Sequence, residues 1–283
     1  MTVRVVTDST ADLPPDLVRE LGITVVPLSV RFGQESFLDG VELSSDAFFQ
    51  RLAAAKELPS TSQPAPGVFF DVYRRLVDSG NQVVSVHISS KLSGTMNSAL
   101  QGKEKLDGGQ VEVLDSLQAT LGLGLVATAA AKAAKGGASL AEVMAVAQLA
   151  IGEVQLFGVL DTLEYLQRGG RIGRVKALLG SILKVRPIIT VREGMPESAG
   201  MARSRAQGIE FLLTVARERA PLKQAAVIYS TTPQEADQLA EQVKPFVQDG
   251  LVIKSRFGPV LGTYVGPGAW GLAVQSEKKD SLA

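Results

Sequence analysis

Two short segments rich in hydroxyl groups carry residues that could bind an anion. Residues 59–67 hold Thr61 and Ser62 among three prolines, and residues 89–95 hold Ser93 and Gly94 directly after an apolar run. Hydroxyl groups and the free N–H groups at the start of a helix are donors that bind carboxylates and phosphates. Both segments fit an anion site, and both also fit an ordinary loop that ends in a helix cap.

Asp8 opens a third polar segment, residues 8–14, at the end of the first apolar run. Aspartyl-phosphate chemistry is one interpretation of Asp8, although that chemistry usually needs a second carboxylate two positions on, where this chain has Thr10. Ser9 and Asp12 have the spacing of a capping box, and a proline follows at the position of a first helical turn. A helix cap is therefore the alternative to a nucleophile.

Tyr264 lies in the middle of a fourth segment, residues 258–268, which contains four glycines and two prolines. These residue types fix a particular backbone path. A phenol is a neutral hydrogen-bond donor that could face a ligand. A rigid turn with a half-buried tyrosine is the alternative.

A basic stretch runs from residue 168 to residue 186 without an acidic residue. It contains Arg168, Arg171, Arg174, Lys176, Lys184 and Arg186. Such a cluster fits a solvated face, but it could also attract a phosphate, an acidic partner or a membrane surface.

Two further patterns are better explained by structure than by chemistry. Gly122, Gly124 and Ala127 match a dinucleotide-binding pattern, but the match does not open directly on a strand, so close helix packing is the favoured interpretation. His87 lies in an apolar strand pattern and is expected to be structural. A serine hydrolase would have to use this histidine as its base.

The composition excludes several classes of protein. The 283 residues include one histidine and no cysteine, which rules out disulfides, thiolate nucleophiles and His- or Cys-rich metal centres. Basic and acidic residues both number 29, so the charge excess of a general nucleic-acid binder is missing. The sequence shows no signal peptide or membrane-spanning run, and the expected location is the cytoplasm.

The elements that must position these segments alternate between β-branched runs and amphipathic helices, which predicts an α/β fold with largely parallel sheets. The expected strands are Val3–Thr7, Ile23–Val30, Gln82–Ile88, Val111–Leu114, Val154–Leu160, Val185–Val191, Ala225–Tyr229, Leu251–Phe257 and Ala269–Gln275. The expected helices are Asp16–Leu21, Ala47–Ala55, Val68–Val77, Met96–Leu106, Ala119–Ala134, Leu140–Ile151, Val175–Leu183, Ala206–Arg219 and Glu235–Val247. We expect two lobes, residues 1–157 and 158–283, that share an interface.

Taken in order, these segments resemble the DegV family. The matching pieces are Asp8–Pro14, Thr61–Pro64, Ile88–Thr95, Asp115–Ser116 followed by Gly122–Gly124, Leu163–Ile172 and Gly266–Gly268. The resemblance covers nearly the whole chain and implies two α/β lobes with a long-chain fatty acid buried between them. It also implies kinship with the fatty-acid-binding subunit of bacterial fatty acid kinase, which presents the carboxylate to a separate ATP-dependent kinase for acyl-phosphate formation in phospholipid metabolism.

On this resemblance the chain is a non-catalytic lipid carrier with no cofactor and no metal. Thr61 and Ser93 would bind the carboxylate, with Ser62, Gly94 and Tyr264 beside them. The family usually has histidine where this chain has Tyr264, so the positive charge of that histidine is lacking here. Arg171 and Arg174 could contact the new phosphate or the kinase, and transient contact with a membrane surface is a further expectation. The alternatives are a hydrolase or phosphotransferase that uses Ser93 or Asp8, and a lipid sensor.

Overall fold

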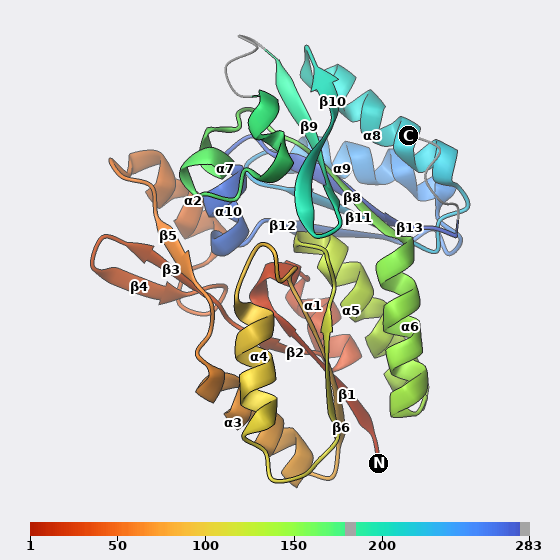
Figure 1. Cartoon of the computed structure of the whole chain (residues 1–283). Coiled ribbons are helices and arrows are strands. Elements are labelled where there is room, and N and C mark those ends of the chain that lie inside the picture. The colour runs from red at the N-terminus through yellow and green to blue at the C-terminus, as the bar shows by residue number, and fades with distance from the viewer. Residues whose placement is uncertain (179–184, 278–283) are drawn as a thin grey trace.

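The computed structural model describes residues 1–178 and 185–277, which form two main β-sheets, a small third sheet and the helices that cover them (Figure 1). The first main sheet has the order β2-β1-β6-β7 and is parallel throughout. Its strands are β1 (Val3–Asp8), β2 (Thr24–Val26), β6 (Gln82–His87) and β7 (Val111–Asp115). The α/β class with a parallel sheet is therefore confirmed.

Helices cover both faces of this first sheet, as its doubly buried, valine-rich strands require. On one face lie α3 (Pro66–Asp78) and α4 (Thr95–Glu104), which also pack against each other. On the other face lies α5 (Thr120–Lys135), which packs beside α1 (Pro15–Leu21) and α6 (Leu140–Glu153). Parallel strands end on one side of a sheet, so the loops that follow β1 and β6 meet there.

The second main sheet has six strands in the order β10-β9-β8-β13-β11-β12. They are β8 (Val154–Val159), β9 (Arg186–Arg192), β10 (Met195–Ala202), β11 (Gln224–Tyr229), β12 (Val252–Arg256) and β13 (Trp270–Gln275). Here the expectation of largely parallel pairing is corrected, because only β11 and β12 pair in parallel. One reason is a two-residue hairpin, since Glu193 and Gly194 both have the positive φ that joins adjacent antiparallel strands.

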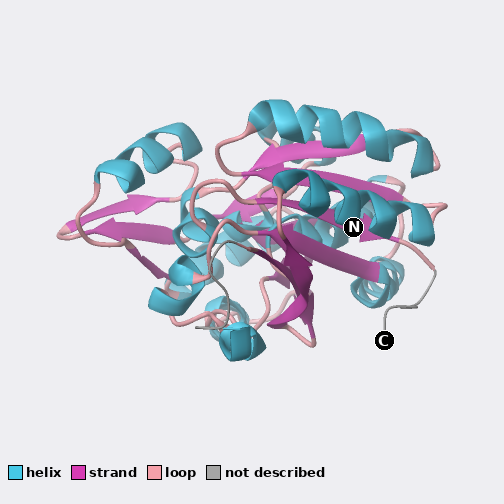
Figure 2. Ribbon diagram, turned by 90° about the horizontal axis from the view of Figure 1, so that it is seen from above, coloured by secondary structure: helices cyan, strands magenta, loops and turns pink. Residues whose placement is uncertain are grey.

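A small antiparallel sheet stands to one side, with α2 (Ser45–Ala54) packed on it (Figure 2). It consists of β3 (Ser29–Phe32), β4 (Glu35–Leu38) and β5 (Ser60–Ser62). The expected strand over residues 23–30 is thus two strands in two sheets, separated at Pro27 and Leu28. Proline cannot donate to a strand ladder, which explains the break.

The remaining helices include α8 (Arg205–Arg219) and α9 (Pro233–Val243), which pack on the outer face of the six-stranded sheet. Shorter turns of helix are η1 (Ser9–Ala11), α7 (Glu164–Arg168), η2 (Gly173–Leu178), η3 (Lys244–Phe246) and α10 (Pro259–Val265). The helix expected over residues 175–183 lies partly outside the described residues. The expected glycine–proline loop contains α10, which starts at Pro259 and ends at Gly266, whose φ is +71°.

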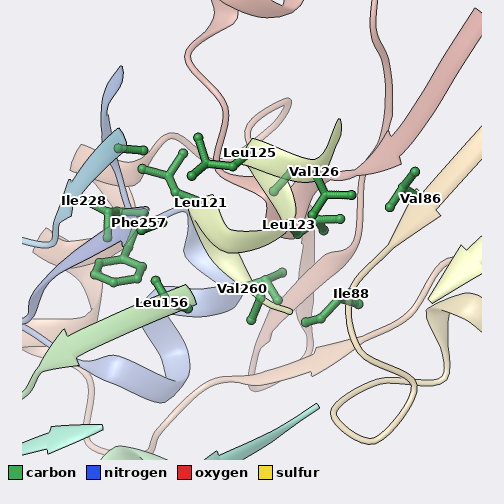
Figure 3. Close-up of a cluster of buried hydrophobic side chains, with 14 of the residues drawn as sticks. Val86, Ile88, Leu121, Leu123, Leu125, Val126, Leu156, Ile228, Phe257 and Val260 are labelled. Atoms are coloured by element: carbon green, nitrogen blue, oxygen red, sulfur yellow. The ribbon is translucent and has the colours of Figure 1, made fainter. Parts of the chain in front are cut away.

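Helix α5 lies between the two main sheets and belongs to the core of both. Its buried leucines pack in one apolar cluster with Val86 and Ile88 from β6 and its following loop, and with Ile228 of β11 (Figure 3). Gly124 allows close approach, because a Cβ there would lie 2.8 Å from the carbonyl oxygen of Ala11. The chain passes from the first main sheet to the second at the junction of α6 and β8. The lobe boundary that we expected after residue 157 falls within β8.

Within residues 1–178 and 185–277, we find no helix long and apolar enough to cross a membrane.

Candidate functional site

A cavity of about 300 Å³ lies between the two main sheets, and most of its wall is aliphatic or aromatic. The first half of the chain contributes Leu28, Ile88, Leu92 and Ala119. The second half contributes Leu156, Leu160, Leu166, Ile189, Val191, Ile228, Phe257, Val260, Leu261 and Val265. Polar side chains line the same cavity, among them Thr61, Ser62, Ser93, Arg171 and Tyr264. An apolar cavity with a few convergent polar groups is the usual form of a small-molecule site.

Thr61 and Tyr264 meet at this polar part of the wall, although they are far apart in the sequence. The hydroxyl oxygen of Thr61 on β5 lies 2.5 Å from that of Tyr264 on α10. The backbone of Gly169 holds the phenol ring from the other side, since a Cβ on Gly169 would lie 2.5 Å from the ring. The half-buried phenol of Tyr264 therefore faces the hydroxyl that the resemblance to the DegV family had assigned to the same site.

Ser93 and Gly94 lie where β6 leads into α4. The Ser93 hydroxyl contacts the Thr95 hydroxyl at 2.8 Å and accepts the Thr95 backbone N–H, and Gly94 is the residue before the first helical turn. A Cβ on Gly94 would lie 2.5 Å from the Gln63 side chain. Gly94 thus lets the Gln63 segment pack directly against the start of α4, next to Ser93.

Arg171 brings a positive charge to the cavity wall. Its guanidinium donates to the carbonyl oxygens of Leu92 and Gly169 at 3.2 and 2.9 Å and lies 5.2 Å from the centre of the Tyr264 ring. Among the described residues, no carboxylate forms an ion pair with it. The positive charge of the guanidinium is therefore not compensated by a carboxylate of the described residues.

The other described arginines of the basic stretch are neutralised by carboxylates. Arg174 pairs with Glu193 and Glu197 at 2.7 and 2.9 Å and does not line the cavity. Arg168 pairs with Glu164, and Arg186 pairs with Asp161. The structure therefore separates Arg171 from Arg174, which the sequence pattern had grouped together. Lys184 of the same stretch lies outside the described residues.

Asp8 and His87 form part of a fully buried hydrogen-bonded chain. Tyr73 donates to Ser85 at 2.7 Å, Ser85 lies 2.7 Å from His87 Nε2, and His87 Nδ1 lies 3.0 Å from Asp8 Oδ2. This order resembles a catalytic triad, but Ser85, His87 and Asp8 have no exposed surface and none of them lines the cavity. The backbone N–H groups of Thr10 and Ile88 also donate to Asp8. The arrangement fits a satisfied structural network, and Ser93 is not bonded to His87.

Two more buried carboxylates hold the start of α10. Asp12 accepts the Gly258 N–H at 2.9 Å, and Asp39 accepts a hydrogen bond from the Val260 backbone. Burial raises the pKa of Asp39 to about 7 and the pKa of Asp12 well above its usual range. These carboxylates therefore contact the start of the helix that carries Tyr264.

Sequence reasoning missed several cavity residues, most clearly Thr10, Gln63, Thr120 and Thr190. Thr120 is a β-branched residue with a φ of +45°, and its hydroxyl donates to Asp12 at 2.6 Å. Such strain is often found at functional sites. For Thr120, the sequence did offer one signal of a site residue, because it is a hydroxyl residue that follows a polar turn. Nothing in the sequence distinguishes Thr190 from other strand residues.

A metal centre finds no support in the described part of the chain. No group of three or more acidic or histidine side chains is placed there to hold a metal ion.

The fold and the cavity define an α/β protein with two main sheets and a largely apolar cavity between them, whose wall also carries several polar side chains. The chain belongs to the DegV family, whose model matches residues 2–277. A DegV domain-containing protein of Deinococcus radiodurans is 34% identical over 281 residues, which cover 97% of this chain and 99% of that protein.

Two solved structures extend the comparison. A DegV family protein from Thermus thermophilus, described in terms of fatty acid binding, superimposes with a TM-score of 0.91 at 35% identity over 98% of this chain and all of the other. DegV from Bacillus subtilis, described as a fatty acid binding protein, gives a TM-score of 0.86 at 33% identity over the same shares.

Proposed function

We propose that this protein binds a long-chain fatty acid in the cavity between its sheets and presents the carboxylate to a separate ATP-dependent kinase. The observation that carries the proposal is the cavity itself, whose largely aliphatic wall also contains Thr61, Ser93, Tyr264 and Arg171. The two similar proteins from Thermus thermophilus and Bacillus subtilis, both described in terms of fatty acid binding, support the same class of ligand.

The acyl tail supplies most of the affinity. Burial of a sixteen-carbon chain is worth about 12 kcal/mol gross at about 0.8 kcal/mol per methylene. Lost freedom on association costs about 4–15 kcal/mol, so little affinity remains without the tail.

The carboxylate is held by the polar part of the wall. A buried carboxylate needs hydrogen bonds or a counter-charge. Thr61 and Ser93 donate to it, Ser62 and the Gly94 N–H stand next to them, and Tyr264 donates its phenol proton. Arg171 supplies the positive charge that the family's histidine supplies at the position of Tyr264, and it also contacts the phosphate once that has been transferred. Arg174 is paired with Glu193 and Glu197 and does not line the cavity. In this proposal it serves at most as a contact with the kinase.

The protein itself does no chemistry in this proposal. A carboxylate oxygen of the bound acid forms a bond to the γ-phosphorus of ATP, the bond from that phosphorus to the ADP oxygen breaks, and ADP leaves. The kinase supplies ATP and its catalytic groups. The carrier keeps the tail out of water, orients the carboxylate and operates in the cytoplasm, where it can meet a membrane surface transiently to exchange lipid.

Native mass spectrometry of gently purified protein tests the binding step. We expect a mass increase that disappears on organic extraction and is recovered as free fatty acid. Protein stripped of lipid should bind stearate with micromolar or tighter affinity. Purified protein that carries no lipid and binds no stearate would contradict the proposal.

A reconstituted reaction tests the presentation step. Loaded protein, ATP and a bacterial fatty acid kinase are mixed, and the acyl-phosphate is trapped as its hydroxamate. We expect product only when all components are present, and less of it with Ser93→Ala. Ser36→Ala is the matched control, because Ser36 is exposed on β4 and does not line the cavity. Stearate binding without product would leave a lipid sensor as the better function, and ester cleavage by the protein alone would favour a hydrolase.

A further inference from the structure

Two glycines lie side by side in the inner face of the six-stranded sheet, where the cavity meets it. Gly158 of β8 pairs directly with Gly271 of β13. Their outer neighbours in the same row are Ile189 of β9 and Ile228 of β11. All four residues line the cavity. The row therefore has a large side chain at each end and none across its two central strands.

Large side chains also border the two glycines along the direction of strand β8. Side chains two apart on a strand point to the same face. Leu156 precedes Gly158 on β8 and Leu160 follows directly after the strand, and both line the cavity. We call the hollow formed by Gly158, Gly271, Leu156, Leu160, Ile189 and Ile228 the glycine basin. Leu156 and Ile228 are seen in Figure 3, both directed toward the space beneath α5.

The two glycines differ in whether the protein itself needs them. A Cβ on Gly271 would lie 2.7 Å from the carbonyl oxygen of Phe157, so this position is restricted by the backbone. A Cβ on Gly158 would meet its nearest neighbour, Ile189, only at 3.5 Å, which is ordinary contact, and its φ is not positive. Glycine inside a strand is destabilising relative to alanine. Nothing within the protein accounts for glycine at 158, whereas the adjacent cavity does.

The basin is wider than a straight acyl chain requires. Neighbouring strands lie about 4.8 Å apart, so the backbones of Ile189 and Ile228 are about 14 Å apart across three spacings. A straight polymethylene chain is about as wide as a single strand spacing. Because the two adjacent glycines have no side chains, this part of the cavity wall has room for an acyl chain that bends or branches sideways.

We propose that residue 158 determines acyl-chain specificity, and that the glycine basin receives a widened part of the tail, either the bend of a cis double bond or a methyl branch. The inference rests on the proposed function, because it concerns the tail of the same ligand. Gly158 provides the space, and the isoleucines and leucines around it set the limits of that space.

Three ligands of equal carbon number test the basin: stearate is straight, oleate is bent and isostearate is branched. With Gly158→Ala, we expect affinity for at least one of the two widened acids to fall by about fivefold or more relative to stearate, since a single methyl group is discriminated by about tenfold in a tight pocket. The thermal midpoint of the lipid-free variant should equal or exceed that of the wild type. Loss confined to oleate identifies the bend, and loss confined to isostearate identifies the branch.

Two further variants complete the test. Gly158→Ala combined with Ile189→Val should restore part of the lost affinity, because it removes a methyl group beside the added one. Gly271→Ala should lower the thermal midpoint, as the backbone contact requires. Unchanged ratios among the three acids in Gly158→Ala, or an equal loss for all three, would overturn the inference while leaving fatty acid binding intact. Failure of the wild type to bind any of the three acids would instead overturn the proposed function.

Discussion

The hydroxyl groups of Thr61 and Tyr264 lie 2.5 Å apart across 203 residues of sequence, and this contact joins the small sheet to α10 at the cavity wall. One of the two hydroxyl groups donates a hydrogen bond to the other. In the proposed function, a carboxylate would replace this neutral hydrogen bond with charge-assisted ones, which are roughly twice as strong.

Replacement of Tyr264 by phenylalanine removes one donor to the carboxylate. We expect stearate affinity to fall by about 1.5–3 kcal/mol, or roughly tenfold to 150-fold, as for a hydrogen bond to a charged group. Titration of the lipid-free protein measures it. Equal affinity in both proteins would show that the phenol does not face the carboxylate.

Tyr264→His should make binding depend on pH. An imidazole with an ordinary pKa near 6.5 is charged below that pH and would attract the carboxylate there. Stearate affinity should therefore rise from pH 8 to pH 6 more steeply in the variant than in the wild type. Parallel pH profiles for the two proteins would contradict the assignment of this position to the headgroup.

Thr61→Val and Ser93→Ala should weaken binding of the acid much more than binding of the matching alcohol. Each lost donor to a carboxylate costs about 1.5–3 kcal/mol, whereas the tail contacts are unchanged. Calorimetric titration with stearate and stearyl alcohol gives the comparison. Equal losses for the two ligands would show that the two hydroxyl groups do not bind the carboxylate.

Arg171→Gln should lower stearate affinity and make it less sensitive to salt, because the variant removes the one guanidinium on the cavity wall that no described carboxylate neutralises. Arg174→Gln is the control, since Arg174 is already paired with Glu193 and Glu197. Similar losses in the two variants would contradict the distinction drawn between these arginines.

Asp39 should make stability depend on pH. Burial raises its pKa in the folded protein from 3.8 to about 7, so the folded state binds a proton that the unfolded chain has released. This contribution to the free energy of unfolding is complete below about pH 4 and is lost as the pH rises through 7. Asp39→Asn should therefore flatten the fall in thermal midpoint between pH 5 and pH 8. A curve parallel to that of the wild type would exclude Asp39 as the cause.

Much of this architecture is visible in the sequence because its strands are valine-rich runs that end in polar loops. Thr61 and Ser62 lie on β5 ahead of α3, and Ser93 lies between β6 and α4. Their residue types and positions fit an anion site or a helix cap, and only the resemblance to the DegV family assigned them to one site. Arg171 was recognised as basic, but its stacking on Tyr264 depends on contact between α7 and α10, which no local pattern encodes.

Other features depend on three-dimensional neighbours. The antiparallel pairing of β13 with β8 and β11 is set by where the last strand inserts, so hydrophobic periodicity cannot reveal it. Gly158 is an unremarkable glycine in the sequence, and its meaning comes only from its partner Gly271 on another strand. The buried network of Asp8 and His87 likewise joins two strands that are nearly eighty residues apart.

Because α5 is buried against both main sheets, the two halves of the molecule cannot swing apart without uncovering Leu121, Leu123 and Leu125, all of which are fully buried. Exposure of each leucine costs about 1.5–3 kcal/mol. In the proposed function, a fatty acid is therefore expected to enter and leave by local displacement of α10 and β5, the segments that carry Tyr264 and Thr61, rather than by a hinge between the two halves.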